Sequence, residues 1–342
     1  DSNPASKGAI IDSLVLQKEG ENKYVGSVEI TDPDGSKIKL DLEVTDHGGK
    51  IFFETKMPQK SISEKPESLP DNLIVDPILE KAIRKELKKP QGELSKMDLR
   101  EVEKLNFFKT QITDVGLMEL EELQDLTSLN LGGTKITDEG LKEVAKLQNL
   151  KTLFLSRTLI TDAGLKEVAK LQNLNTLSLW ETKISGAGFK DLAKLQKLKF
   201  LQLDDTQITD AGLKEIAKLR QLELINLGNT QITDAGLKEV DKLQGLEQLF
   251  LDNTKVTDDG LKNLTNLHNL TYLSLRGTQI TDAGLMELGK LQTLEGLNLS
   301  NTQITDKNLK EVAKLMMLEQ IILRNTQITD EGLKEVAKLQ SL

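Results

Sequence analysis

Residues 134–156 read TKITDEGLKEVAKLQNLKTLFLS, and this segment recurs down the chain with few changes. The threonine that opens each copy returns every 24 residues without insertion. It stands at Thr110, Thr134, Thr158, Thr182, Thr206, Thr230, Thr254, Thr278, Thr302 and Thr326. A strict period of this length predicts a solenoid, in which equal units stack and each unit contacts only its neighbours. Such a stack offers a long repeated surface. We expect the functional residues to lie at positions where the amino acid differs from one repeat to the next.

Each unit combines a strand pattern with a helix pattern. Leu150, Leu153 and Leu155 alternate with polar residues, as in a short strand that buries one face. The apolar residues before them have the spacing of a turn and a short helix with one buried face. Thr137 and Asp138 precede this helix, so we expect their side-chain oxygens to accept hydrogen bonds from its first N–H groups.

The motif L-x-x-L-x-L-x-x-T-x-I-T-D-x-G-L, seen in residues 150–165, resembles the leucine-rich repeat. The ITDxGL part is similar to the cysteine-containing repeat subfamily and to the threonine-bearing bacterial repeats common in planctomycete proteins. The resemblance covers residues 102–342, as an array of ten 24-residue repeats. It implies an α/β fold: a curved leucine-rich-repeat solenoid with a parallel β-sheet on its concave side and helices on its convex side.

Residues 73–101 resemble the helical N-terminal cap of internalin-like bacterial proteins. Asp76 followed by Pro77 is a favourable helix start, because proline at the first helical position loses no needed donor. Ser95–Asp98 matches a capping box for a second short helix. A cap is required because the first strand would otherwise expose an open sheet edge. No C-terminal cap follows before Leu342, so we expect a truncated chain or an edge that a partner covers.

The chain before the cap has a different pattern. Residues 9–55 alternate between apolar and polar residues, and we predict a small antiparallel β-meander domain of about four strands over residues 1–57. Residues 58–72 contain Pro58, Pro66 and Pro70 among serine and lysine residues, and this composition predicts a linker.

Composition excludes several function classes. The chain has 45 Lys and Arg against 54 Asp and Glu, and the net charge of −9 argues against nucleic acid as a partner. There is no cysteine, hence no disulfide framework and no thiol chemistry. No apolar run is long enough to predict a membrane span. The cap resemblance favours the bacterial cell envelope or secretion over the cytoplasm, and the oligomeric state stays open.

Candidate catalytic residues are few. His47 lies in a glycine-rich turn and His268 lies between a helix and the next strand, so neither suggests a catalytic triad. The Asp32-x-Asp34-Gly35 segment is better explained as a hairpin turn than as a calcium loop. We therefore expect no enzymatic activity, no cofactor and no metal.

The residues between the strand leucines face the concave surface, and there the repeats differ. Six of the eight aromatic residues of the repeat region occupy these positions: Phe108, Phe154, Trp180, Phe200, Phe250 and Tyr272. Interface cores are enriched in aromatic residues, which favours a binding patch. The alternative is that neighbouring rings merely cover one another.

The repeat that carries Trp180 is also the most divergent. Ser185 and Gly186 replace the usual Thr-Asp pair, and Phe189 replaces a leucine. We interpret Phe189 as core filling. The lost aspartate indicates either local tolerance or a loop remodelled beside the site.

These observations predict a non-enzymatic recognition module that binds a protein or peptide on its concave face. The predicted partner-binding residues are Phe154, Trp180, Phe200, Asp204, Phe250, Asp252, Tyr272 and Arg276. Two alternatives remain open. The aromatic and polar residues also suit stacking with a cell-wall or surface glycan, and a regular array also suits a structural spacer.

Overall fold

The computed structural model describes residues 10–18, 23–31, 37–47, 50–56 and 74–339. The chain forms two compact units, Asp1–Pro70 and Asp71–Leu342. In the first unit, four antiparallel strands pair in chain order: β1 (Ile10–Lys18), β2 (Lys23–Thr31), β3 (Lys37–His47) and β4 (Lys50–Lys56). The predicted linker, residues 58–72, lies outside the described residues.

The second unit is built on a ten-stranded parallel sheet whose strands also pair in chain order. The pairing is offset by one repeat at each step, so that Leu129 pairs with Leu105 on one side and Leu153 on the other. The predicted solenoid with one parallel strand per repeat is therefore confirmed. The strands are β5 (Lys104–Asn106), β6 (Ser128–Asn130), β7 (Thr152–Phe154), β8 (Thr176–Ser178), β9 (Phe200–Gln202), β10 (Leu224–Asn226), β11 (Gln248–Phe250), β12 (Tyr272–Ser274), β13 (Gly296–Asn298) and β14 (Gln320–Ile322).

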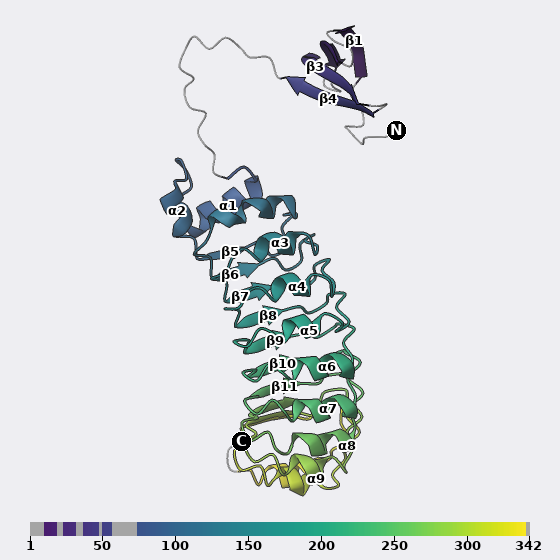
Figure 1. The fold of residues 1–342 in the computed structure, drawn as a ribbon. Coiled ribbons are helices and arrows are strands. Elements are labelled where there is room, and N and C mark those ends of the chain that lie inside the picture. The colour runs from purple at the N-terminus through teal and green to yellow at the C-terminus, as the bar shows by residue number, and fades with distance from the viewer. Residues whose placement is uncertain (1–9, 19–22, 32–36, 48–49, 57–73, 340–342) are drawn as a thin grey trace. The chain divides into compact units, whose positions relative to one another are not determined.

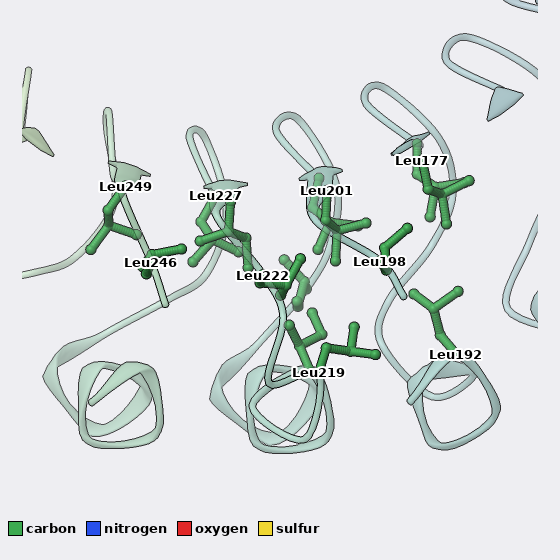
Figure 2. Packing of buried hydrophobic residues seen from close by; sticks show 14 of the residues in the cluster. Leu177, Leu192, Leu198, Leu201, Leu219, Leu222, Leu227, Leu246 and Leu249 are labelled. Atoms are coloured by element: carbon green, nitrogen blue, oxygen red, sulfur yellow. The ribbon is translucent and has the colours of Figure 1, made fainter. Parts of the chain in front are cut away.

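Short helices form the other side of the second unit, as Figure 1 shows. They are η1 (Val115–Glu122), α3 (Gly140–Val144), α4 (Leu165–Val168), α5 (Phe189–Leu192), α6 (Asp210–Ile216), α7 (Asp234–Val240), α8 (Asp258–Leu261), η2 (Lys262–Leu264), α9 (Leu285–Leu288), α10 (Leu309–Val312) and α11 (Asp330–Val336). Leucines from both layers fill the space between them (Figure 2). Leu177 and Leu201 of the sheet and Leu192 and Leu219 of the helical side are all buried.

Two helices precede the sheet, α1 (Pro77–Glu86) and α2 (Lys96–Arg100). The predicted helix start is present, since α1 begins at Pro77. The Asp76 carboxylate adds a cap, because it accepts hydrogen bonds from Ile78 N and Leu79 N. A capping box between Ser95 and Asp98 starts α2. Helix α1 packs against β5, the first edge of the parallel sheet, so its apolar face covers the first repeat.

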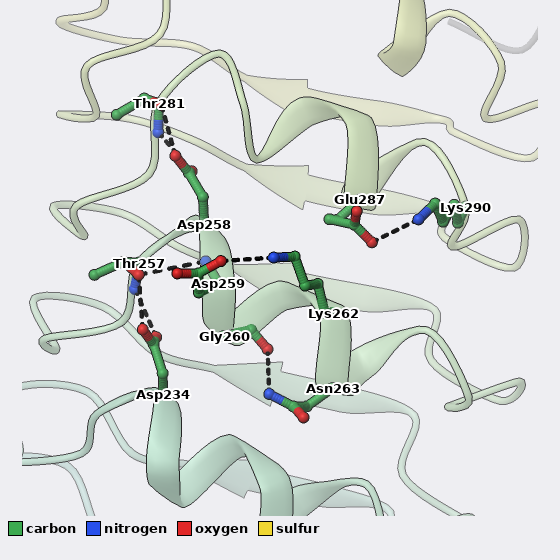
Figure 3. A network of polar contacts seen from close by, with 10 residues as sticks. All are labelled: Asp234, Thr257, Asp258, Asp259, Gly260, Lys262, Asn263, Thr281, Glu287 and Lys290. Carbon is green, nitrogen blue, oxygen red and sulfur yellow. Dashed lines mark hydrogen bonds and ion pairs between the residues drawn. The ribbon is translucent and has the colours of Figure 1, made fainter.

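The repeated threonine and aspartate have different roles. The Thr257 hydroxyl accepts a hydrogen bond from Asp259 N, so the predicted threonine cap is confirmed. The Asp234 carboxylate instead accepts from Thr257 N at 2.8 Å and from the Thr257 hydroxyl at 2.7 Å, one repeat further on (Figure 3). The prediction that the aspartate caps its own helix is therefore wrong, because the next repeat offers its carboxylate two donors. We call this contact the Asp–Thr bracket.

The bracket recurs along most of the array and explains the glycine of ITDxGL. A Cβ atom at Gly260 would lie 2.3 Å from Asp234 Oδ1, so the carboxylate occupies the space of a side chain. Equivalent brackets join Asp114 to Thr137, Asp138 to Thr161, Asp162 to Ser185, Asp210 to Thr233, Asp258 to Thr281, Asp282 to Thr305 and Asp306 to Thr329. Gly186 interrupts the series, and its backbone instead approaches that of Gly212.

Candidate functional site

The concave face is the face of the parallel sheet opposite the leucine core. It carries three rows of side chains: the first residue of each strand, the third residue, and the second residue after the strand. We call the last of these the third row. It runs Phe108, Gly132, Ser156, Trp180, Asp204, Gly228, Asp252, Arg276, Ser300, Arg324. Along the sheet this row is therefore aromatic at its start, acidic in its middle and basic at its end.

Phe108, Phe154 and Trp180 line a hollow of about 180 Å³ on the concave face. Small buried side chains lie among them: Ser156 and Ser178 have hydroxyls 2.7 Å apart. The Ser178 hydroxyl also donates to Gln202 Oε1 at 2.7 Å. Both serine hydroxyls therefore have hydrogen-bond partners within the protein. Because the two side chains are small, they leave room between the rings. We call this feature the aromatic hollow.

The Trp180 ring is held from one side by a cation. The Arg157 guanidinium lies 4.4 Å from the ring centroid, and its Nε forms a 2.5 Å ion pair with Glu181. A cation over an indole face is attracted by the ring quadrupole. Trp180 and Phe154 are half-buried and Phe108 is 46% exposed, so all three rings keep surface available to a partner.

The residue before each repeat threonine has a left-handed backbone, a conformation that favours glycine and asparagine. Later repeats follow this preference, for example with Asn229, but three successive repeats around Trp180 carry charged residues instead. The φ angles are 56° at Arg157, 54° at Glu181 and 56° at Asp205. A residue other than glycine held in such a conformation costs about 1–3 kcal/mol.

The other predicted aromatic residues lie outside the aromatic hollow. Phe200 is 36% exposed in the first row of the sheet and does not line the hollow. Phe250 and Tyr272 form a separate pair, with ring centroids 5.1 Å apart and an interplanar angle of 36°. The two groups of aromatic residues thus occupy different parts of the concave face.

The middle of the third row is acidic. Asp204 Oδ1 is buried without a hydrogen-bond partner among the described residues. Burial raises the pKa of the Asp204 carboxyl, and the charges of Asp205 and Asp252 raise it further. Asp252 accepts a hydrogen bond from the Ser274 hydroxyl. Burial, with the nearby Asp252, also raises the pKa of Tyr272.

A second, larger hollow of about 820 Å³ lies at the basic end of the concave face. Its lining residues are Arg276, Asn298, Ser300, Asn301, Gln320, Ile321, Ile322, Leu323, Arg324 and Asn325. Arg276 was predicted as a site residue, whereas Arg324 was not. We call this feature the arginine hollow.

Sequence reasoning missed two residues beside Trp180. Phe108 is one of the concave-facing aromatic residues of the sequence pattern but is not among the predicted site residues, although it lines the aromatic hollow. Arg157 is not among the predicted residues because it follows the segment in which apolar and polar residues alternate. Aligning the repeats gives a signal for its position, because six of the ten residues before the repeat threonine are glycine or asparagine.

The described residues offer little support for other chemistry. They include no group of three or more His, Cys, Asp or Glu side chains that could hold a metal ion. In the part of the chain that the structure describes, no helix is long and apolar enough to cross a membrane.

Comparison with known proteins places the repeats in a family. A model of a leucine-rich repeat region matches residues 101–259, and a leucine-rich repeat model matches residues 266–289 and 314–337. The chain belongs to the leucine-rich-repeat proteins. These proteins are generally interaction modules that use extended concave surfaces.

Solved structures agree with the fold of this leucine-rich-repeat protein. An internalin from Listeria monocytogenes has a TM-score of 0.56 and 24% identity, over 81% of this chain and 98% of that chain. A leucine-rich-repeat protein from Leptospira interrogans has a TM-score of 0.56 and 25% identity, over 72% of each chain. A search of curated proteins found no match.

Proposed function

We propose that this chain is a non-enzymatic recognition module that binds a protein or peptide partner through the aromatic hollow. The observation that carries the proposal is the set of three partly exposed rings, Phe108, Phe154 and Trp180, around small buried serines. An apolar side chain of the partner would insert between these rings. Aromatic residues in such central positions commonly supply about 2 kcal/mol or more of binding free energy each.

The surroundings of Trp180 support this proposal. Its ring is pre-positioned by Arg157, which is itself paired with Glu181. Side chains that are ordered before binding lose less conformational entropy when the complex forms. The ion pair also leaves both charges at the rim of the aromatic hollow, where they can add specificity for a partner.

Two unfavourable features near Trp180 have no evident benefit for folding. Charged residues occupy left-handed backbone positions at residues 157, 181 and 205. Asp204 keeps a buried carboxylate oxygen without a hydrogen-bond partner among the described residues. Both features reduce stability, so a contribution to recognition is a physical reason for them.

Selection from a random peptide library displayed on phage tests the proposal without knowledge of the natural partner. Enriched peptides are then photo-cross-linked to chains that carry benzoylphenylalanine in place of either Phe154 or Met286. Met286 is 55% exposed on α9, on the helical side, and serves as the matched control. We expect cross-links from position 154 and none from position 286.

Other outcomes would favour the two alternatives. Equal cross-linking from both positions would contradict a concave-face site. Binding of cell-wall glycan fragments that displaces the enriched peptides would favour a glycan ligand. Failure to enrich any peptide, together with no binding of such glycans, would favour the spacer.

A further inference from the structure

Arg276 and Arg324 differ from most cations on the helical side of the array. There, lysines commonly pair with an acidic residue one turn away, as Lys290 does with Glu287 at 2.7 Å. Neither arginine side chain forms an ion pair or hydrogen bond with another residue that the structure describes, and both are exposed. The arginine hollow between them contains no Asp or Glu in its lining, in a chain with 54 such residues.

The side-chain amide of Asn298 adds a hydrogen-bond donor to the arginine hollow. Asn298 Oδ1 accepts a hydrogen bond from Ser300 N at 3.1 Å, which leaves the Asn298 amide nitrogen as a donor without a described partner. Guanidinium groups bind carboxylates through paired parallel hydrogen bonds. Two free guanidinium groups in a hollow without acidic side chains are complementary to an anionic ligand.

We propose that Arg276 and Arg324 form a subsite for two carboxylates of an acidic segment of the partner protein. This inference rests on the proposed function, because it extends the same concave-face interface. The net charge of −9 repels acidic segments from most of this protein, so a local pair of arginines determines where such a segment can bind.

The spacing of the two arginines indicates the spacing of the carboxylates. They lie in one row, two strands apart, which is about 10 Å at ~4.8 Å per strand. In a polyproline II segment, residues three apart share a face and are separated by about 9 Å. In a β-strand, residues two apart share a face but are only about 7 Å apart. The geometry therefore favours a Glu-x-x-Glu pattern in polyproline II conformation.

The acidic middle of the third row adds a constraint on such a partner. Trp180 and Arg276 are four strands apart, or about 19 Å, which is about six residues of polyproline II. Asp204 and Asp252 lie between them and disfavour acidic residues in that stretch. The partner segment thus carries an apolar residue and, roughly six residues away from it, the acidic pair.

Two fluorescein-labelled peptides of equal composition test the carboxylate spacing. Glu-Pro-Pro-Glu-Pro-Pro-Glu has the spaced pattern, and Pro-Pro-Glu-Glu-Glu-Pro-Pro has the same charge without it. Fluorescence anisotropy at low ionic strength compares their affinities, since screening is weakest there. We expect the spaced peptide to bind at least about fivefold more tightly, because only it reaches both guanidinium groups.

The double variant Arg276→Gln/Arg324→Gln tests the residues. It should weaken binding of the spaced peptide at least about tenfold, through loss of two charge-assisted contacts. The control variant Lys166→Gln/Lys214→Gln removes the same charge from exposed positions on α4 and α6. It should change the affinity less than about twofold, because the lysines lie on the opposite side of the array.

Three results would contradict the proposed subsite. They are equal affinity for the two peptides, no binding of either peptide, or an equal loss of affinity for the spaced peptide in the arginine and lysine variants. Trp180→Ala should leave binding of these short acidic peptides unchanged, because they carry no apolar anchor. The two proposals therefore fail separately. If Trp180→Ala weakens the library peptides while the arginine variant still binds the spaced peptide normally, only the arginine subsite is wrong.

Discussion

At the scale of single residues, the two residues that directly follow β8 have opposite roles. Leu179 is fully buried among the repeat leucines, whereas Trp180 lies half-buried on the concave face. The alternation of the strand continues past Ser178, so one side chain enters the core and the next lies on the concave face. Stability and recognition are therefore separable at adjacent positions.

This separation gives a first prediction. Trp180→Ala should lower the free energy of unfolding by only about 0.5–1 kcal/mol, mostly through loss of the Arg157 contact. Leu179→Ala should lower it by about 2–5 kcal/mol, because it leaves a cavity in the core. Urea unfolding followed by circular dichroism compares the two. A similar loss in both variants would mean that Trp180 is packed as structure.

The left-handed position of Glu181 gives a second prediction. Glu181→Asn should stabilise the array by about 0.5–1 kcal/mol, because asparagine tolerates this backbone conformation better than glutamate. The lost ion pair with Arg157 is solvent-exposed and contributes little. The control is Glu331→Asn, which removes a similar exposed ion pair from helix α11. A melting temperature that falls equally in both variants would contradict the strain argument.

Asp204 gives a third prediction, in the pH dependence of stability. Its folded pKa is raised, mainly by burial, so the ionised form is disfavoured in the folded state. The penalty is absent below the unfolded pKa of ~3.9 and appears as pH rises through the folded pKa. Asp204→Asn should therefore raise the melting temperature at pH 7 and much less at about pH 3. A gain of equal size at both pH values would show that ionisation is not the cause.

Some of these residue positions could be predicted from the sequence and others could not. The buried leucines followed from alternation, because burial on one face of a strand has a period of two. The stacking of Arg157 on Trp180 did not, because the two residues are 23 positions apart and meet only through the pairing of β7 with β8. Phe108 was visible as a concave residue, but its approach to Phe154 and Trp180 depends on the small residues between them.

At the scale of elements, the Asp–Thr bracket joins most repeats to the next, with an interruption at Gly186. The repeat period predicted the strand and the short helix, together with the threonine cap. It did not predict the bracket, because the carboxylate and its donors lie one repeat apart and either role satisfies the ITD pattern. The close approach at Gly260 is the physical signal that the carboxylate leaves its own helix.

The bracket gives a fourth prediction. Asp234→Ala should cost about 1–3 kcal/mol, because it leaves the Thr257 N–H and hydroxyl without their acceptor. Asp330 has the same place in its repeat, is exposed, and forms no bracket with a described residue, so Asp330→Ala is the matched control. We expect a loss below about 0.5 kcal/mol there. Equal urea midpoints for the two variants would contradict the bracket's contribution.

At the scale of the whole molecule, the array is stabilised by contacts between neighbouring repeats and by the helix that covers its first edge. Helix α1 packs on β5, with Leu79 and Ile83 fully buried. At both ends of the described sheet the concave face keeps exposed residues, Phe108 after β5 and Arg324 after β14. The predicted fold of the repeats is thus confirmed, and the use of the concave face as the partner surface stays a proposal.

The affinity of the library-selected peptides for three chains tests the central claim most directly. Isothermal titration calorimetry compares the unchanged protein with Trp180→Ala and with Met286→Ala, its exposed control on the helical side. We predict that Trp180→Ala weakens binding at least about 30-fold, equivalent to ~2 kcal/mol, while Met286→Ala changes it less than about twofold. Equal affinities for all three chains would contradict recognition through the aromatic hollow.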